Sequence, residues 1–269
     1  MPRFFPFFAA AAALVAIVPA RAADAAAIIA KARAYLGPEA ALDSIRSIHY
    51  VGSFESDETV KDKDGKLSTR HFKAALDLIF QKPYQQRVVM TSDRGRDITA
   101  LDNYEAWECL QQPGDTSVRN LNLFGKDQVK DRRANVWENL SFYRGIERRG
   151  GHVEDLGPTT VDGHACEKLA FVHGPNIVFY RYIDTATGQL RLTELTNGDR
   201  IRQEGELTAG GVRFPRKLIN LTKDPASGKE YTAVITLDKV VLNETFPDSL
   251  FAVPLLAAPA LSAPSPKAK

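Results

Sequence analysis

Residues 153–207 read VEDLGPTTVDGHACEKLAFVHGPNIVFYRYIDTATGQLRLTELTNGDRIRQEGEL. Short runs of alternating apolar and polar residues are separated by turn signals such as Asp162-Gly163, Gly174-Pro175 and Asn197-Gly198-Asp199. Strands joined by turns this short pair antiparallel, because a parallel pair needs a crossover of about a dozen residues. This stretch therefore predicts a series of antiparallel hairpins.

The same pattern extends to both sides of this stretch. A half-buried strand begins at Ile48, where apolar residues start to alternate with polar ones. The other strands that we expect are Arg70–Phe80, Gln85–Ser92, Asp97–Leu101, Tyr104–Leu110, Val153–Thr160, Ala165–His173, Ile177–Asp184, Gln189–Thr196, Arg200–Leu207, Arg213–Leu221 and Tyr231–Leu242. About eleven or twelve strands at this spacing predict an α+β, mainly β, fold: one highly curved antiparallel sheet with helices on one face.

Helical periodicity occurs at the start of the chain and once in its middle. An apolar stripe follows Asp24 as far as Gly37, and a second short helix is expected from Pro38 to about Ser47. Residues 126–148 carry another apolar stripe, which predicts one or two helices, and end in arginines before Gly150-Gly151. We expect these helices to cover the sheet.

The first 22 residues, MPRFFPFFAAAAALVAIVPARA, have the pattern of a secretory signal peptide. Arg3 supplies the charged start, an apolar run follows, and Ala20-Arg21-Ala22 is a small-x-small cleavage site. We expect cleavage after Ala22 and a periplasmic or secreted protein. Residues 23–256 are expected to form a single domain, and the Ala/Pro-rich residues 257–269 a disordered tail.

The composition after cleavage excludes several function classes. Removal of Arg3 and Arg21 leaves 33 basic and 33 acidic residues, so the basic bias of a nucleic-acid-binding protein is missing. The sequence lacks G-x-S-x-G, Walker, G-x-G-x-x-G and H-E-x-x-H motifs. His164 and Cys166 are too few ligands for a structural zinc site. We therefore expect no catalytic residues, no cofactor and no metal site.

Two cysteines, Cys109 and Cys166, fall on different expected strands. In an oxidising compartment they could form a disulfide, or they could be two separate buried thiols. The spacing leaves both alternatives open, since it does not show whether the two Cβ atoms meet.

Five segments, in this order and spacing, resemble a known family. They are the opening helix pair and strand (residues 35–48), Tyr104-Glu105-Ala106-Trp107, and the segments at 160–169, 182–190 and 240–254. Together they resemble the outer membrane lipoprotein-sorting, or LolA-like, family of periplasmic carriers. The resemblance implies an incomplete antiparallel β-barrel with helices covering its concave face and an apolar cavity between. It also implies a monomer that carries lipid or lipoprotein acyl chains, with a membrane-bound protein as donor or acceptor.

Apolar residues at these periods are the candidates for the cavity lining. The strand candidates are Tyr50, Phe54, Leu78, Phe80, Val89, Trp107, Leu169, Phe171, Phe179 and Leu192, and the helical candidates are Trp137, Leu140 and Tyr143. Ordinary core packing explains the same residues, and periodicity does not tell which strand face points inward.

Two further functions stay open at this point. One is a sensory or regulatory binding domain on the same scaffold, similar to the RseB-type regulators, that uses the Arg144–Arg149 cluster for a partner. The other is a secreted hydrolase whose site assembles only in space, which would show carboxylates or histidines with shifted pKa values in a cleft.

Overall fold

The computed structural model describes residues 25–61, 63–118, 120–223 and 228–255. The expected signal peptide and the expected C-terminal tail lie outside these residues.

The described chain is built mainly of strands. They are β1 (Ser47–Lys61), β2 (Leu67–Gln81), β3 (Gln85–Ser92), β4 (Gly95–Asp102), β5 (Glu105–Gln111), β6 (Asn122–Leu123), β7 (His152–Val161), β8 (His164–Gly174), β9 (Ile177–Asp184), β10 (Leu190–Leu195), β11 (Arg200–Glu204), β12 (Leu207–Ala209), β13 (Val212–Phe214), β14 (Lys217–Lys223) and β15 (Glu230–Leu242). Sequence patterning misses β6 and β12, which span two and three residues, too few to show an alternation. The expected strand Arg213–Leu221 is divided in the structure into β13 and β14.

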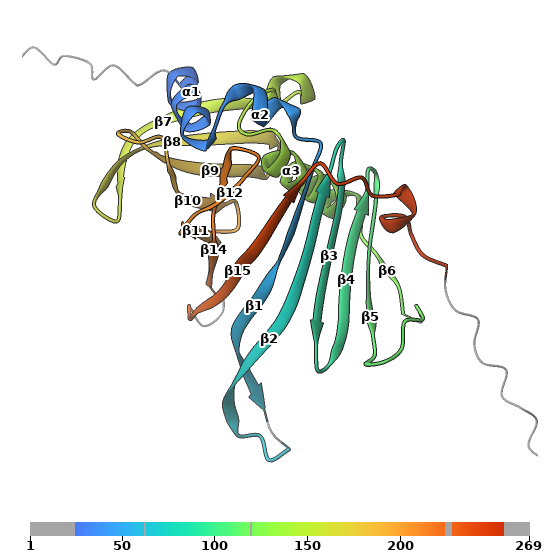
Figure 1. Cartoon of the computed structure of the whole chain (residues 1–269). Helices are drawn as coiled ribbons and strands as arrows, with labels where there is room; N and C mark the ends of the chain where they lie inside the picture. Colours follow the sequence, from blue (N-terminus) through green and yellow to red (C-terminus); the bar gives the residue numbers. More distant parts are fainter. Residues whose placement is uncertain (1–24, 62, 119, 224–227, 256–269) are drawn as a thin grey trace, which may run out of the picture.

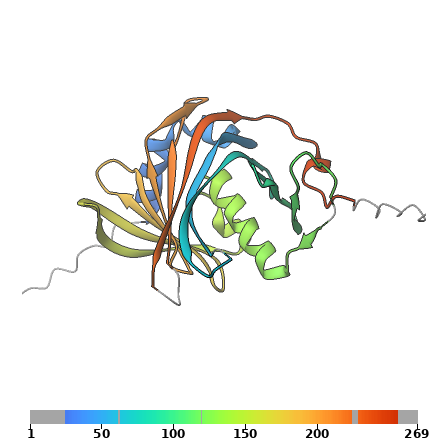
Figure 2. The same ribbon diagram turned by 90° about the horizontal axis from the view of Figure 1, so that it is seen from below.

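Thirteen of these strands form one sheet in the order β6-β5-β4-β3-β2-β1-β15-β14-β11-β10-β9-β8-β7. Each neighbouring pair is antiparallel. The edge strands β6 and β7 do not pair with each other, so the sheet curves without closing (Figure 2). The expected incomplete antiparallel barrel is confirmed, with more strands than the eleven or twelve expected.

A bulge bends the sheet where β1 meets β15. The register between these strands shifts at Val51 and Gly52. A Cβ atom at Gly52 would lie 2.0 Å from the carbonyl oxygen of Thr236, so only glycine allows this close approach of the two backbones.

The helices are α1 (Ala25–Leu36), α2 (Glu39–Ser44) and α3 (Lys126–Leu140), with short 3-10 turns at Ile146–Arg149 and Asp248–Leu250. The expected pair of N-terminal helices is confirmed. Residues 126–148, expected to form one or two helices, hold α3 and then the 3-10 turn at Ile146–Arg149. The two are separate because Phe142 and Tyr143 adopt left-handed backbone angles (φ 50° and 69°).

Helix α3 lies inside the curve of the sheet, whereas α1 and α2 lie at one end of it (Figures 1 and 2). Val129, Val136 and Leu140 of α3 pack in a core cluster with residues of β1–β5 such as Leu76 and Phe80.

Trp137 of α3, with Tyr143 and Ile146 that follow it, packs against Leu169 and Phe171 of β8 in a second core cluster. The helix therefore bridges the two halves of the curved sheet. Burial of these side chains, at about 1.5–3 kcal/mol each, is the main force that holds α3 in the concavity.

The two cysteines are free thiols, each buried in a different cluster. Cys109 packs beside Trp107 on β5, and Cys166 packs beside Tyr182 near the other end of the sheet. The disulfide alternative is therefore wrong for this structure, because the two strands lie in different halves of the sheet.

Candidate functional site

The strand register decides which candidate residues face the interior of the curve. Tyr50 pairs with Leu78, and Leu78 pairs with Val88, so all three lie on one face. That face contacts α3, and we call it the concave face. The candidates on or against it are Tyr50, Phe54, Leu78, Phe80, Leu169, Phe171, Phe179, Trp137, Leu140 and Tyr143.

Three candidates lie on the opposite, convex face. Val89 pairs with Ile98, and Trp107 pairs with Ala100, so both fall out of phase with Leu78. They form a small cluster that Val118, Leu121 and Val253 cover. The indole N–H of Trp107 donates to the carbonyl of Phe251 at 2.9 Å.

Leu192 is the third convex residue, and it packs with Tyr182. The structure does not bring these three residues together with the concave set. Sequence did not distinguish these convex apolar residues from concave ones, because Val118, Leu121 and Val253 pack against the convex face too.

The concave residues differ in how fully they are covered. Phe80, Leu169 and Phe171 are almost completely buried, and they are core residues. Phe54 is only half-buried, as are three neighbours on the same face: Phe72, Leu218 and Ile235. We call these four residues the concave shelf.

The concave shelf is contiguous. Phe54 pairs with Ile235 across β1 and β15, and Ile235 pairs with Leu218 across β14. The rings of Phe54 and Phe72 are 6.1 Å apart in an edge-to-face arrangement. Strands β1 and β2 extend past α3 at this point (Figure 1). The shelf is an apolar surface that the helices leave partly open.

Two hollows run beside α3 on the other half of the sheet. One, of about 310 Å³, lies between Arg132 and Asn135 of α3 and the apolar residues Phe179 and Leu195. The other, of about 480 Å³, reaches His173. They share Asp131, Asn176 and Ile177, and their sizes are in the range of small-molecule sites. Their walls are polar on the helix side and partly apolar on the strand side.

A buried charged cluster fastens α3 to β8 and β9. The carboxylate of Glu138 accepts from Arg181 Nη2 at 2.5 Å and lies 2.7 Å from His173 Nε2. Arg181 also donates to Thr193 Oγ1 at 2.8 Å. The side chains of Glu138 and His173 are only 1% and 3% exposed.

Removing one member of such a cluster leaves a buried charge without its partner, which costs about 3–5 kcal/mol. Sequence reasoning missed these three residues. The signal that could have found them is polarity at inward positions: Glu138 directly follows Trp137 in the apolar stripe, and Arg181 alternates with Tyr180 and Tyr182.

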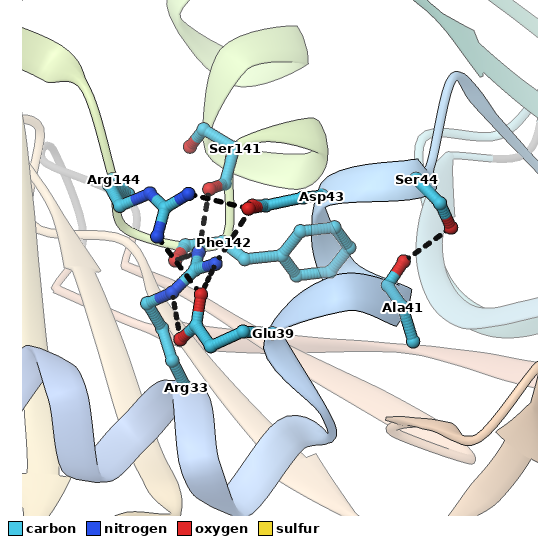
Figure 3. A network of polar contacts seen from close by, with 8 residues as sticks. All are labelled: Arg33, Glu39, Ala41, Asp43, Ser44, Ser141, Phe142 and Arg144. Carbon is cyan, nitrogen blue, oxygen red and sulfur yellow. Dashed lines mark hydrogen bonds and ion pairs between the residues drawn. The ribbon is translucent and has the colours of Figure 1, made fainter.

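A second polar network joins both N-terminal helices to the turn after α3 (Figure 3). Arg33, 3% exposed, donates to Glu39 at 2.5 Å, to Asp43 at 3.1 Å and to the carbonyl of Phe142 at 2.7 Å. The hydrogen bond from Arg33 lowers the pKa of Glu39. Arg144 donates to the same two carboxylates at 3.0 and 2.6 Å.

The curved sheet with helices on its concave face can be compared with known proteins. A LolA superfamily protein from Nitrosomonas europaea superposes with a TM-score of 0.53 at 13% identity, over 85% of this chain and 97% of that one. The fold is LolA-like.

A second solved structure has the same LolA-like arrangement. It is a domain from Vibrio parahaemolyticus named for outer membrane lipoprotein sorting, with a TM-score of 0.50 at 7% identity over 83% of this chain and 95% of that one. No protein-family model matches this sequence, and no curated protein matches it. The likeness is therefore one of fold.

Two further observations concern only the described residues. None of their helices has the length and apolar character needed to cross a bilayer. No group of three or more His, Cys, Asp or Glu side chains among them is arranged to hold a metal ion.

Proposed function

We propose that this protein is a non-catalytic periplasmic carrier that holds the acyl chain of a lipid or a lipidated protein against the concave face of its LolA-like domain. In this proposal the signal peptide is removed after Ala22, and residues 23–256 form the single carrier domain. A membrane-bound protein would deliver or receive the cargo.

The observation that carries the proposal is the half-open concave shelf. Four apolar side chains lie together on the inside of a curved sheet, where an acyl chain would complete their burial. Each methylene transferred from water to such a surface stabilises the complex by about 0.8 kcal/mol. An eight-carbon stretch would therefore contribute about 6 kcal/mol before the cost of ordering the chain.

Helix α3 is the element that would move to enlarge the site. Trp137, Leu140 and Tyr143 would then serve as a lid whose apolar contacts an acyl chain replaces. The Glu138 cluster limits this movement, because separating Glu138 from Arg181 exposes buried charges. We expect α3 to shift about its charged contacts rather than to leave the concavity.

The test is binding of a fluorescent fatty-acyl probe to the mature protein and to an Ile235→Gln variant. Ile235 is half-buried in the middle of the concave shelf, so a polar amide there should weaken probe binding at least tenfold. The matched control is Val51→Gln on the neighbouring strand, because Val51 is 37% exposed and faces the convex side. Probe binding to this control should equal that of the wild type.

Two outcomes would contradict the proposal. If both variants bind the probe as well as the wild type does, the acyl chain does not use the concave shelf. If the wild type binds no acyl probe, and native mass spectrometry of protein from a periplasmic fraction shows no co-purified lipid or lipopeptide, the regulatory alternative takes its place.

A further inference from the structure

A pocket of about 520 Å³ lies where α2, the β2–β3 turn, the end of α3 and the 3-10 turn at Ile146–Arg149 meet. Four cationic side chains line it, namely Lys82, Arg144, Arg148 and Arg149, against one carboxylate, Asp43. The Arg144–Arg149 cluster is visible in the sequence, and the proposed acyl site does not use it.

The single carboxylate of the pocket is already engaged. Asp43 accepts from Arg144 at 2.6 Å and from Arg33 at 3.1 Å. Among the residues that the structure describes, Lys82, Arg148 and Arg149 form no ion pair. The pocket lining therefore has an excess of positive charge, four cations against one carboxylate.

Burial makes this excess of positive charge unfavourable when no ligand is bound. The Nη1 atom of Arg149 is buried without a hydrogen-bond partner. Loss of solvent is the largest effect on Arg149 and lowers its pKa, and burial together with nearby Arg46 lowers the pKa of Lys82. Cations in this situation gain free energy when an anion arrives, because it replaces lost water and neutralises repulsion.

The floor of the pocket is apolar and aromatic. Leu42, Leu140, Trp137 and Tyr84 contribute to it. The guanidinium of Arg149 lies over the Tyr84 ring, 4.7 Å from its centre, in a cation–π contact. A positive rim over an apolar floor matches a ligand with an anionic group joined to an apolar one.

The geometry points to an anion-binding subsite: we infer that this pocket binds a phosphate or carboxylate group through Lys82, Arg148 and Arg149. This proposal rests on the proposed function: the cargo is an anionic lipid whose head group occupies the pocket. Trp137 and Leu140 belong both to the pocket floor and to the helix that would act as lid, so head-group binding and lid position are connected.

The test compares two soluble lipids with the same single short acyl chain, an anionic lysophosphatidylglycerol and an uncharged monoacylglycerol, with inorganic phosphate as a third ligand. The variant is Lys82→Gln/Arg148→Gln, which removes two charges from the rim and leaves the stacked Arg149 and the ion-paired Arg144 in place. The control is Lys217→Gln/Lys239→Gln, which removes two exposed lysines from the convex side of β14 and β15.

The wild type and the control should bind the anionic lipid at least tenfold more tightly than the uncharged lipid. The Lys82→Gln/Arg148→Gln variant, here called the rim variant, should lose this preference and bind the uncharged lipid as tightly as the wild type does. Calorimetry at low and high salt measures the affinities, and the preference should decrease with salt. Equal affinity for both lipids in the wild type, or a preference that survives in the rim variant, would overturn the subsite and leave the carrier function intact.

Binding of inorganic phosphate distinguishes the outcomes in which neither lipid binds. If neither lipid binds but phosphate binds to the wild type and not to the rim variant, the subsite holds a free anion and the carrier function fails. If phosphate and both lipids all fail to bind, both proposals are wrong. Circular dichroism spectra of both variants should superpose on the wild-type spectrum. This control ensures that the binding measurements compare folded proteins.

Discussion

At the residue scale, Glu167 is a buried acid whose pKa is raised. Its side chain lies on the inward face of β8 and is 3% exposed. Loss of solvent, and then the nearby carboxylate of Asp155, raise the pKa of Glu167 to about 7. A protonated Glu167 can donate a hydrogen bond to Asp155, whereas two ionised carboxylates repel each other.

This raised pKa makes stability depend on pH in a defined direction. The folded state holds the Glu167 proton more tightly than the unfolded chain, so its contribution is complete below about pH 4.5 and is lost as the pH rises through about 7. Glu167→Gln cannot ionise, so between pH 5 and pH 8 its free energy of unfolding should fall less than that of the wild type, by about 1–2 kcal/mol.

Urea unfolding of both proteins at several pH values measures this difference. Glu204→Gln, which removes an exposed carboxylate from β11, is the control and should follow the wild-type curve. Parallel curves for Glu167→Gln and the wild type would contradict the prediction.

At the element scale, the contact between α1 and the β9–β10 turn depends on one glycine. Gly188 has a φ of 81°, and a Cβ atom there would lie 2.5 Å from the backbone carbonyl oxygen of Lys31 in α1. Gly198, in the β10–β11 turn, has a φ of 86° and open space where its Cβ would be. Both glycines have a left-handed backbone conformation, but only Gly188 lies against a helix.

Replacement of each glycine by alanine therefore separates the cost of a left-handed backbone conformation from the cost of a steric clash with α1. Gly198→Ala should lower the free energy of unfolding by about 1–2 kcal/mol, the cost of a left-handed conformation. Gly188→Ala should cost about 1–3 kcal/mol more, because α1 must move away from the turn. Chemical denaturation of the two variants checks the order, and equal destabilisation would show that α1 does not rest on this turn.

At the scale of the whole molecule, the two tryptophans report on opposite faces of the sheet. Trp137 lies on α3 at the concave side, and Trp107 lies in the convex cluster with its N–H bonded to Phe251. The sequence contains no other tryptophan. Intrinsic fluorescence can therefore locate a conformational change without a label.

If α3 shifts when an acyl chain binds, the fluorescence change should come from Trp137. We expect the change on addition of lipid to persist in Trp107→Phe and to disappear in Trp137→Phe. A signal that follows Trp107 instead would place the response on the convex face, contrary to the proposed lid.

Much of this architecture could be predicted from local sequence signals. Turn residues such as Asp162-Gly163 and Asn197-Gly198 separate period-two runs, and they predicted the antiparallel strands. The stop at Gly37 divided α1 from α2 correctly. The end of α3 could not be predicted, because Phe142 and Tyr143 adopt left-handed angles that their residue types do not favour.

The sequence by itself determined the fold class and which segments form helices, because periodicity and turn chemistry act over a few residues. Only the tertiary structure decided that Val89, Trp107 and Leu192 face away from α3, since both faces of this sheet are covered and period two does not distinguish them. The Glu138–Arg181–His173 cluster and the basic pocket also required it, because their members meet only when segments far apart in the chain are packed together.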